Sequence, residues 1–196
     1  MRRKLIVLPL FAALLLVAFG TGARCIMATA THVTSGDTFD ATANDPVGWG
    51  GDCQVTQGDQ YHVRLIDVNA PTGSECYAQE ATDYLTNLIE GKPVCLGRDI
   101  GCRDTSGNIL AYVGVNSSGT GMGCDTFVNA EMVRRGYART VTTGNPTALR
   151  WLLNFLQCQA YAEKAGMWGA CPDLTPPTGC MVHPTPSPHS TGTPSP

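Results

Sequence analysis

The sequence has few charged residues and no excess of basic ones. Charged residues make up 15% of its 196 residues, with 13 Lys and Arg against 16 Asp and Glu, a formal charge of −3. Four of the basic residues and none of the acids lie in the first 24 positions, so the remainder carries a charge of −7. This acidic balance disfavours general electrostatic binding to nucleic acid. The 43% hydrophobic content predicts a globular domain with a core.

The chain also lacks an apolar run long enough to span a membrane comfortably. Its longest run, over 5–19, follows a basic start at 2–4 and precedes small residues at 20–23. This order is typical of an export signal. We therefore predict a signal peptide over 1–23 with cleavage near 23–30, and a secreted or extracytoplasmic protein with no membrane span after its removal. An uncleaved anchor is the alternative.

None of the nine cysteines belongs to a C-x-x-C pair, so their spacing does not favour a zinc site or a thioredoxin motif. In an exported chain, cysteines are expected to form disulfides. Without Cys25, which lies beside the leader, eight cysteines remain for four bridges. The sequence does not choose among their pairings.

The composition changes near the C-terminal end. Eight of the 13 prolines fall within 172–196, among many Ser and Thr residues. Because proline interrupts helices and sheet ladders, we expect a Pro/Ser/Thr-rich disordered tail over 172–196, following one domain at 31–171. A stalk or wall-associated adaptor that uses this tail is one functional alternative.

Between leader and tail, the hydrophobic pattern predicts strands first and helices later. Apolar runs favour strands at 32–42 (broken by a turn at 36–38), 61–68, 94–96 and 109–115. Helical periodicity and stop signals predict helices at 81–89, 129–135 and from 145–146 to about 166. One helix lies among the strands and the others follow them, which indicates an α+β domain built on a small barrel.

Several short sequence blocks lie in a fixed order over 32–169. They are Ser35-Gly36-Asp37-Thr38, RLIDVNAP at 64–71, Glu80-Ala81, Asp104 with ILAYV at 109–113, VNxxMVxxGYA at 128–138, and AGMW at 165–168. In this order they resemble the staphylococcal nuclease (thermonuclease) family. The resemblance implies an OB-fold, a five-stranded β-barrel with three α-helices, here stabilised by disulfides. It also implies calcium-dependent hydrolysis of DNA and RNA phosphodiesters, with nucleic acid as the partner. The sequence does not identify a protein partner.

The charged site residues of that family match this chain only in part. By the resemblance, Asp37 matches the first metal-binding aspartate, and Arg64 matches the first arginine that clamps the phosphate. Asn69 stands where the second metal-binding aspartate is expected, Thr72 where the catalytic glutamate is expected, and Asn108 where the second arginine is expected. Three of the five charged positions are therefore neutral.

The missing groups are expected to be costly for catalysis. Loss of a general base lowers a rate by about 10²–10⁴, and loss of an arginine on phosphoryl oxygens by about 10³–10⁵. Asn69 offers calcium only an uncharged oxygen, so any calcium site is expected to be weak. Asp67, two residues before Asn69 in the expected strand, could add a ligand, and Glu75 could serve as an alternative base.

These substitutions predict an exported, catalytically degenerate nuclease-like protein with a binding or structural role. The alternative is a weak calcium-dependent endonuclease that recruits Glu75 or Asp67. A structural ion pair with Asp37 or Asp67 is the other interpretation of Arg64, and it requires no substrate.

Overall fold

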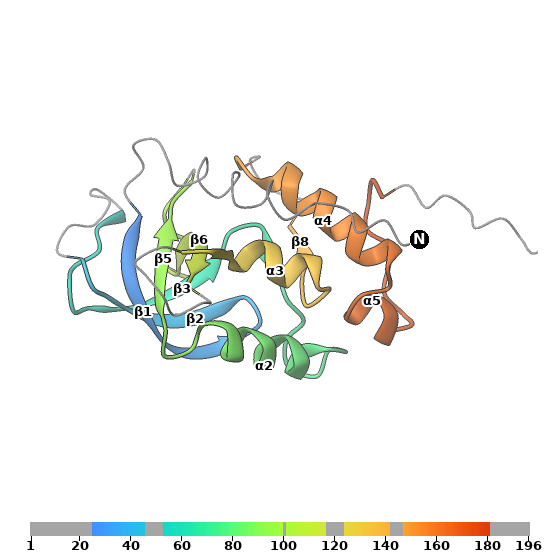
Figure 1. The fold of residues 1–196 in the computed structure, drawn as a ribbon, viewed down its shortest axis with the longest axis horizontal. Coiled ribbons are helices and arrows are strands. Elements are labelled where there is room, and N and C mark those ends of the chain that lie inside the picture. The colour runs from blue at the N-terminus through green and yellow to red at the C-terminus, as the bar shows by residue number, and fades with distance from the viewer. Residues whose placement is uncertain (1–24, 46–52, 100, 117–123, 142–146, 181–196) are drawn as a thin grey trace, which may run out of the picture.

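The computed structural model describes residues 25–45, 53–99, 101–116, 124–141 and 147–180 (Figure 1). Its strands are β1 (Ile26–Ser35), β2 (Thr38–Ala43), β3 (Gln60–Leu65), β4 (Val68–Asn69), β5 (Pro93–Gly97), β6 (Ile109–Val115), β7 (Thr126–Phe127) and β8 (Arg139–Thr140). Its helices are α2 (Ala78–Ile89), α3 (Val128–Arg134), α4 (Arg150–Ala162) and α5 (Met167–Ala170). The long strands gather at one end of the molecule, and α4 and α5 lie toward the other end.

Five strands form a closed barrel. Antiparallel pairs join them in the order β3-β2-β1-β5-β6, and a parallel pairing of β3 with β6 closes the ring. The short β7 pairs with β6, and β4 pairs with β8 in a separate two-stranded sheet. Together with helices α2, α3 and α4, this arrangement confirms the predicted α+β class and the OB-fold barrel.

Each of the three helices buries one apolar face. The inward positions repeat at helical spacing, as the sequence predicts. They are Ala81, Leu85 and Ile89 in α2, Val128, Met132 and Val133 in α3, and Leu152, Leu153 and Leu156 in α4. A glycine in the left-handed region follows α2 at Gly91 and α3 at Gly136, with φ values of 74° and 73°, which confirms both predicted stops.

The predicted single strand over 61–68 is wrong. β3 ends at Leu65 and β4 begins at Val68, because Asp67 adopts a positive φ of 57° and turns the chain into the second sheet. The buried side chain of Asn129 supports this turn from inside. Its amide donates to the carbonyl of Ile66 at 3.0 Å, and its oxygen accepts from the N–H of Val113 at 2.9 Å.

Other boundaries also differ from the sequence prediction. β1 begins at Ile26, upstream of the expected domain start at 31. α4 begins at Arg150 rather than near 145–146, which lies outside the described residues, and it ends at Ala162. The chain then turns through Gly166, where a Cβ would lie 2.4 Å from the carbonyl oxygen of Gly136. This close approach ends the helical path before α5 and fastens α3 to the C-terminal segment.

Four disulfides are present and Cys25 is free, in agreement with the sequence prediction. The bridges are Cys53–Cys102, Cys76–Cys171, Cys95–Cys124 and Cys158–Cys180. The second joins cysteines 95 positions apart and links the loop after β4 to the end of α5. The fourth attaches the start of the Pro-rich segment to α4, and 181–196 lie outside the described residues. Within the described part of the chain, none of the helices has the length and apolar character needed to cross a membrane.

Candidate functional site

Arg64 lies at the centre of the barrel edge that carries the predicted site residues. The β2–β3 register places Thr38 opposite Arg64, and the β3–β6 register places Leu110 on its other side. The turn that holds Asp37 therefore flanks Arg64 on one side, and the turn over 104–108 flanks it on the other. The barrel topology brings together three segments that are far apart in the sequence.

Asp37 is buried and its carboxylate accepts four hydrogen bonds. Oδ1 accepts from the hydroxyls of Ser35 and Thr38, both at 2.9 Å. Oδ2 accepts from the N–H of Ala70 at 3.1 Å and from Nη2 of Arg64 at 3.4 Å. Because two carboxylate oxygens offer about four lone-pair positions, this carboxylate is fully engaged within the protein.

The glycine before Asp37 is required by packing rather than by its backbone angle. A Cβ at Gly36 would lie 2.7 Å from the Cβ atoms of both Ala70 and Ala81. The β1–β2 turn therefore presses closely on the loop after β4 and on α2. This contact places the Asp37 carboxylate beside the N–H of Ala70 and holds the β1–β2 turn against the loop after β4.

Arg64 connects Asp37 with Asn69. Its Nη2 lies 3.4 Å from Asp37 Oδ2 and donates to Asn69 Oδ1 at 3.2 Å. Of the two ion-pair partners expected for Arg64, Asp37 is the one it contacts, and Asp67 pairs with Arg150 instead. The Arg64 side chain is 34% exposed, and both contacts use the same terminal nitrogen.

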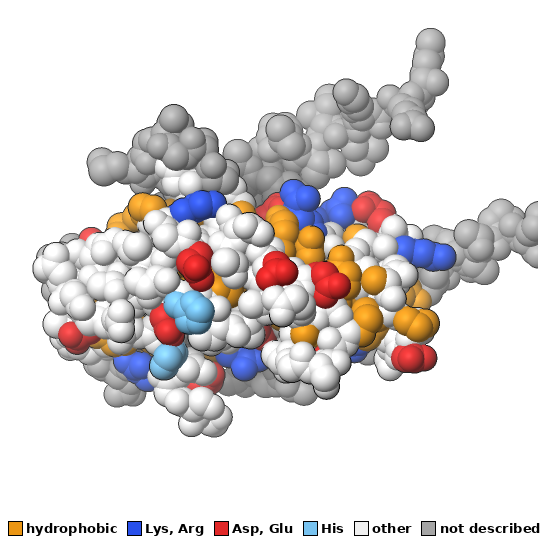
Figure 2. All heavy atoms as spheres, turned by 90° about the horizontal axis from the view of Figure 1, so that it is seen from below, with side chains coloured by type: hydrophobic (Ala, Val, Ile, Leu, Met, Phe, Trp, Pro, Cys, Tyr) orange, Lys and Arg blue, Asp and Glu red, His pale blue; other side chains and the backbone are white. Residues whose placement is uncertain are grey.

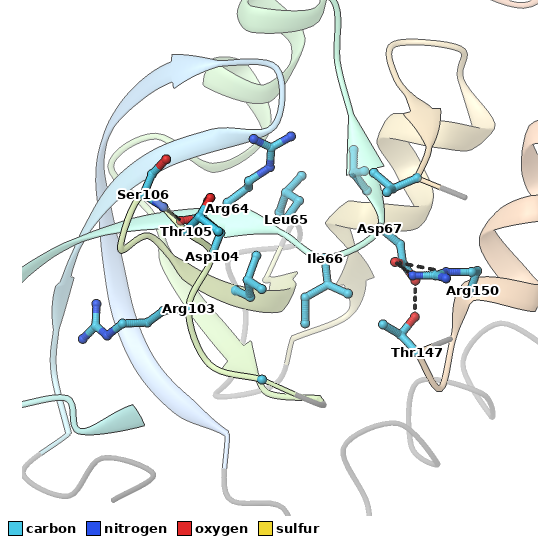
Figure 3. Close-up of a pocket in the computed structure, with 14 residues that line it drawn as sticks. Arg64, Leu65, Ile66, Asp67, Arg103, Asp104, Thr105, Ser106, Thr147 and Arg150 are labelled. Atoms are coloured by element: carbon cyan, nitrogen blue, oxygen red, sulfur yellow. Dashed lines mark hydrogen bonds and ion pairs between the residues drawn. The ribbon is translucent and has the colours of Figure 1, made fainter. Parts of the chain in front are cut away.

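Arg64, Asp37 and Asn69 form a group that we call the Arg64 cluster, and Asp67 faces away from it. Its carboxylate accepts from Arg150 Nη2 at 2.8 Å and Nε at 3.3 Å, and it also contacts the hydroxyl of Thr147. Figure 3 shows Asp67 pointing toward Arg150 and Thr147, whereas the guanidinium of Arg64 points in another direction. The argument that Asp67 shares a strand face with Asn69 assumed a continuous strand, and the positive φ at Asp67 removes that alternation.

Thr72 and Glu75 form a small hydrogen-bonded turn. Oε2 of Glu75 accepts from the N–H of Thr72 at 2.6 Å and from its hydroxyl at 3.4 Å, and the N–H of Glu75 donates to the Thr72 carbonyl at 3.0 Å. The bond from the Thr72 N–H to the Glu75 carboxylate is one half of a capping box, whereas the Glu75 N–H bonds the Thr72 carbonyl rather than its hydroxyl. It brings the Glu75 carboxylate to the backbone of the position where the resemblance expects a catalytic glutamate.

Asn108 is committed to the turn before β6. Its side-chain amide donates to Asp104 Oδ2 at 2.9 Å, and its backbone N–H donates to Asp104 Oδ1 at 2.9 Å. Partial burial raises the pKa of Asp104, but the hydrogen bonds from Asn108 and Ser106 outweigh it and leave the pKa below its usual value. The Asp104 carboxylate is therefore ionised at neutral pH and orders this turn.

Two cavities adjoin the Arg64 cluster. One, of about 560 Å³, opens between Arg64, the turn over 104–108 and the start of α4, and Arg103, Asp104 and Arg150 line it (Figure 3). The other, of about 330 Å³, adjoins Asn69. It is lined by Asn69, Pro71, Glu75, Cys76, Arg139 and Leu174.

The closed barrel, with a buried aspartate paired to a partly exposed arginine at its edge, is an OB-fold domain. A family model described as staphylococcal nuclease homologue matches residues 62–170. A protein of Escherichia coli named an uncharacterized endonuclease is 32% identical over 115 residues, which are 59% of this chain and 67% of that protein. The chain therefore belongs to the staphylococcal nuclease homologue family, as its sequence blocks predict.

The family is typically calcium-dependent, but the residues of this site do not fit a calcium ion of that kind. Calcium takes six to eight oxygen ligands, usually with several carboxylates among them. Here Asp37 is engaged by four donors, Asn69 is neutral, and Asp67 is paired with Arg150. Across the described ranges there is no group of three or more His, Cys, Asp or Glu side chains that could hold a metal.

The sequence analysis missed the roles of Arg139 and Arg150. Arg150 pairs with Asp67 across 83 positions, and no local pattern predicts a contact of that range. Arg139 lies opposite Asn69 because of a pairing between two strands of two residues each. The block that ends at Ala138 could have drawn attention to the following Arg139.

Proposed function

We propose that this protein is an exported member of the family whose catalytic centre is degenerate, and that it binds phosphate esters rather than hydrolysing them. The observation that supports this proposal is the position of Arg64. Its guanidinium lies between Asp37 and Asn69, the two positions that match the family's metal ligands. A built-in cation there balances the carboxylate without calcium and keeps further N–H donors for an anion.

The neutral positions support the same proposal. Thr72 carries no group with a pKa suited to a general base, and the Asn108 amide is held by Asp104. Figure 2 shows one face of the molecule, on which acidic, basic and histidine side chains are scattered among uncharged atoms. With a charge of −7 outside the first 24 residues, binding would be local to the Arg64 cluster rather than spread along a polymer.

A cleavage assay tests the proposal. The disulfide-bonded protein, in excess over single-stranded DNA and with calcium, is expected to give no cleavage above that of its Arg64→Ala variant. Calcium-dependent cleavage that disappears in Arg64→Ala would contradict it. Recovery of all four disulfides by mass spectrometry is the control for correct folding.

A weak calcium-dependent endonuclease is the second candidate, and the hydrogen bonds between Glu75 and Thr72 favour it. They hold a carboxylate near the position of the missing base. If cleavage occurs, Glu75→Gln should lower it by about 10²–10⁴, as expected for loss of a general base. Glu80→Gln, on an exposed position of the neighbouring helix α2, is the matched control.

Export is supported by the four disulfides, which persist in oxidising compartments. We propose that the leader is removed near residue 23 rather than near residue 30. Ile26, Ala28 and Ala30 are buried, and 26–29 pair with β5, so cleavage after Ala30 would remove a strand segment from the barrel. N-terminal sequencing of the secreted protein is expected to find a start close to Cys25.

A further inference from the structure

Arg139 lies directly across from Asn69. The antiparallel β4–β8 pairing matches these two residues, so their side chains leave the same face of the small sheet. In such a pair the Cβ atoms lie about 4.5–5.5 Å apart. Arg64 donates to Asn69 Oδ1 at 3.2 Å, so Asn69 adjoins both arginines.

The surroundings of Arg139 orient its side chain without neutralising it. Its guanidinium lies 5.3 Å from the ring centre of Trp168, whose side chain is buried in the cluster that contains Cys171. A cation over an aromatic ring keeps its full charge and its in-plane N–H donors. By contrast, Arg134, Arg135 and Arg150 pair with carboxylates, and no such ion pair is found for Arg139 among the described residues.

Arg139 also lines the cavity of about 330 Å³ together with Asn69 and Glu75. A cavity of this size accommodates a small ligand such as a nucleotide. The Glu75 carboxylate is turned toward the N–H and hydroxyl of Thr72, which partly offset its charge. The cavity is thus bordered by one oriented cation, one amide and one hydrogen-bonded carboxylate.

We propose that Arg139 is the second phosphate-binding cation of this site. With Arg64, which donates to Asn69, it forms a clamp beside Asn69 that takes one phosphate of a mononucleotide or short single-stranded oligonucleotide without a metal. It thereby replaces the arginine that position 108 lacks. The inference rests on the proposed binding function and adds its residues and its ligand class.

The test measures the binding of a fluorescein-labelled single-stranded DNA tetranucleotide to the full disulfide-bonded protein in the presence of a chelator. Arg139→Gln and Arg64→Gln are each expected to weaken binding about tenfold or more, because each removes charged hydrogen bonds. Arg134→Gln, which removes a surface arginine paired with Glu163, is the matched control and should bind as wild type does. Inorganic phosphate should compete with the oligonucleotide.

Two further measurements sharpen the test. Because the clamp takes one phosphate, log K should fall against log salt with a slope of about −0.7 for single-stranded DNA. A slope of about −2, as expected if all the phosphates between the four nucleotides are neutralised, would indicate tracking along the strand and would overturn the clamp. Arg139→Lys keeps the charge and should recover most of the affinity lost in Arg139→Gln; equal weakening in both variants would also overturn it.

The outcomes separate this inference from the proposed function. Wild-type protein that binds no oligonucleotide would contradict the binding function itself. Binding that needs Arg64 but is unchanged in Arg139→Gln would leave that function intact and exclude Arg139 from the site. Glu75→Gln should strengthen binding by removing a nearby negative charge, and weaker binding in that variant would contradict the arrangement proposed for this cavity.

Discussion

Two buried aspartates near the same barrel edge are held in different ways. The side chain of Asp67 is 4% exposed and its partner Arg150 is 14% exposed, with 2.8 Å between their charged atoms. The side chain of Asp37 is 5% exposed, but its partner Arg64 is 34% exposed and lies at 3.4 Å. The first pair is closed on both sides, whereas the second has one member that reaches solvent.

This difference separates a structural ion pair from one that can accept a ligand. Arg150 cannot leave Asp67 without leaving a buried charge uncompensated, which is strongly unfavourable. Arg64 can keep its contact with Asp37 through Nη2 and offer its other N–H groups to an anion. The Asp67 corner, formed by Asp67 and Arg150, therefore holds the β3–β4 turn to α4. The Asp37 corner, formed by Asp37, Arg64 and the positions around them, is where we propose that a phosphate binds.

Rebuilding the Asp37 corner is expected to have the largest effect. The combined change Asn69→Asp, Thr72→Glu and Asn108→Arg restores every charge that the family pattern has and this chain lacks. We expect calcium-dependent cleavage of single-stranded DNA at least about 10³ above the wild-type background, because a base and a second arginine are both regained. The same triple change with Arg64→Ala is the control, and no gain of activity in the folded triple variant would contradict the assignment of these positions.

Breaking the Asp67 corner is expected to have the next largest effect. Arg150→Ala should lower the free energy of unfolding by about 3–5 kcal/mol, since it leaves Asp67 buried without its cation. Arg64→Ala should lower it by only about 1 kcal/mol, because Asp37 keeps three other donors and Arg64 is partly solvated. Urea unfolding with the disulfides intact measures both changes, and equal losses in the two variants would show that the pairs do not differ as described.

The smallest effect is expected at the turn before β6, which flanks Arg64 but is held by the hydrogen bonds between Asn108 and Asp104. The Asp104 pKa is lowered in the folded state, so its contribution to stability is present above the unfolded pKa and is lost as the pH falls through the folded value. Asn108→Ala should raise the Asp104 pKa toward 3.8 and weaken this acid dependence. Carboxyl NMR titration measures the shift, and an unchanged pKa would show that Asn108 does not hold the carboxylate.

Much of this organisation follows from local sequence patterns. The strand at 109–115 matches β6 in full, and the apolar spacing of α2 and the glycine after α3 agree with the sequence prediction. The retained Asp37 and Arg64 also meet, because barrel closure follows from the fold that the sequence blocks indicate.

The parts that could not be predicted depend on contacts between distant residues. The apolar run over 61–68 gives no sign of the turn at Asp67, which is stabilised by Asn129 from α3 and by Arg150 from α4. The role of Arg139 depends on the pairing of two very short strands, which carry almost no periodic signal. The pairing of the cysteines likewise depends on how the loops are placed in space, which their spacing in the sequence does not determine.

The central claim is that Arg64 stands in place of a calcium ion between Asp37 and Asn69. Calorimetric titration of the disulfide-bonded protein with calcium tests it most directly, without relying on activity. We predict no binding in the wild-type protein at millimolar calcium and measurable binding in the Asn69→Asp, Arg64→Ala double variant, where a second carboxylate replaces the amide and the guanidinium is removed. Tight calcium binding by the wild-type protein that is lost in Asp37→Ala would contradict the account.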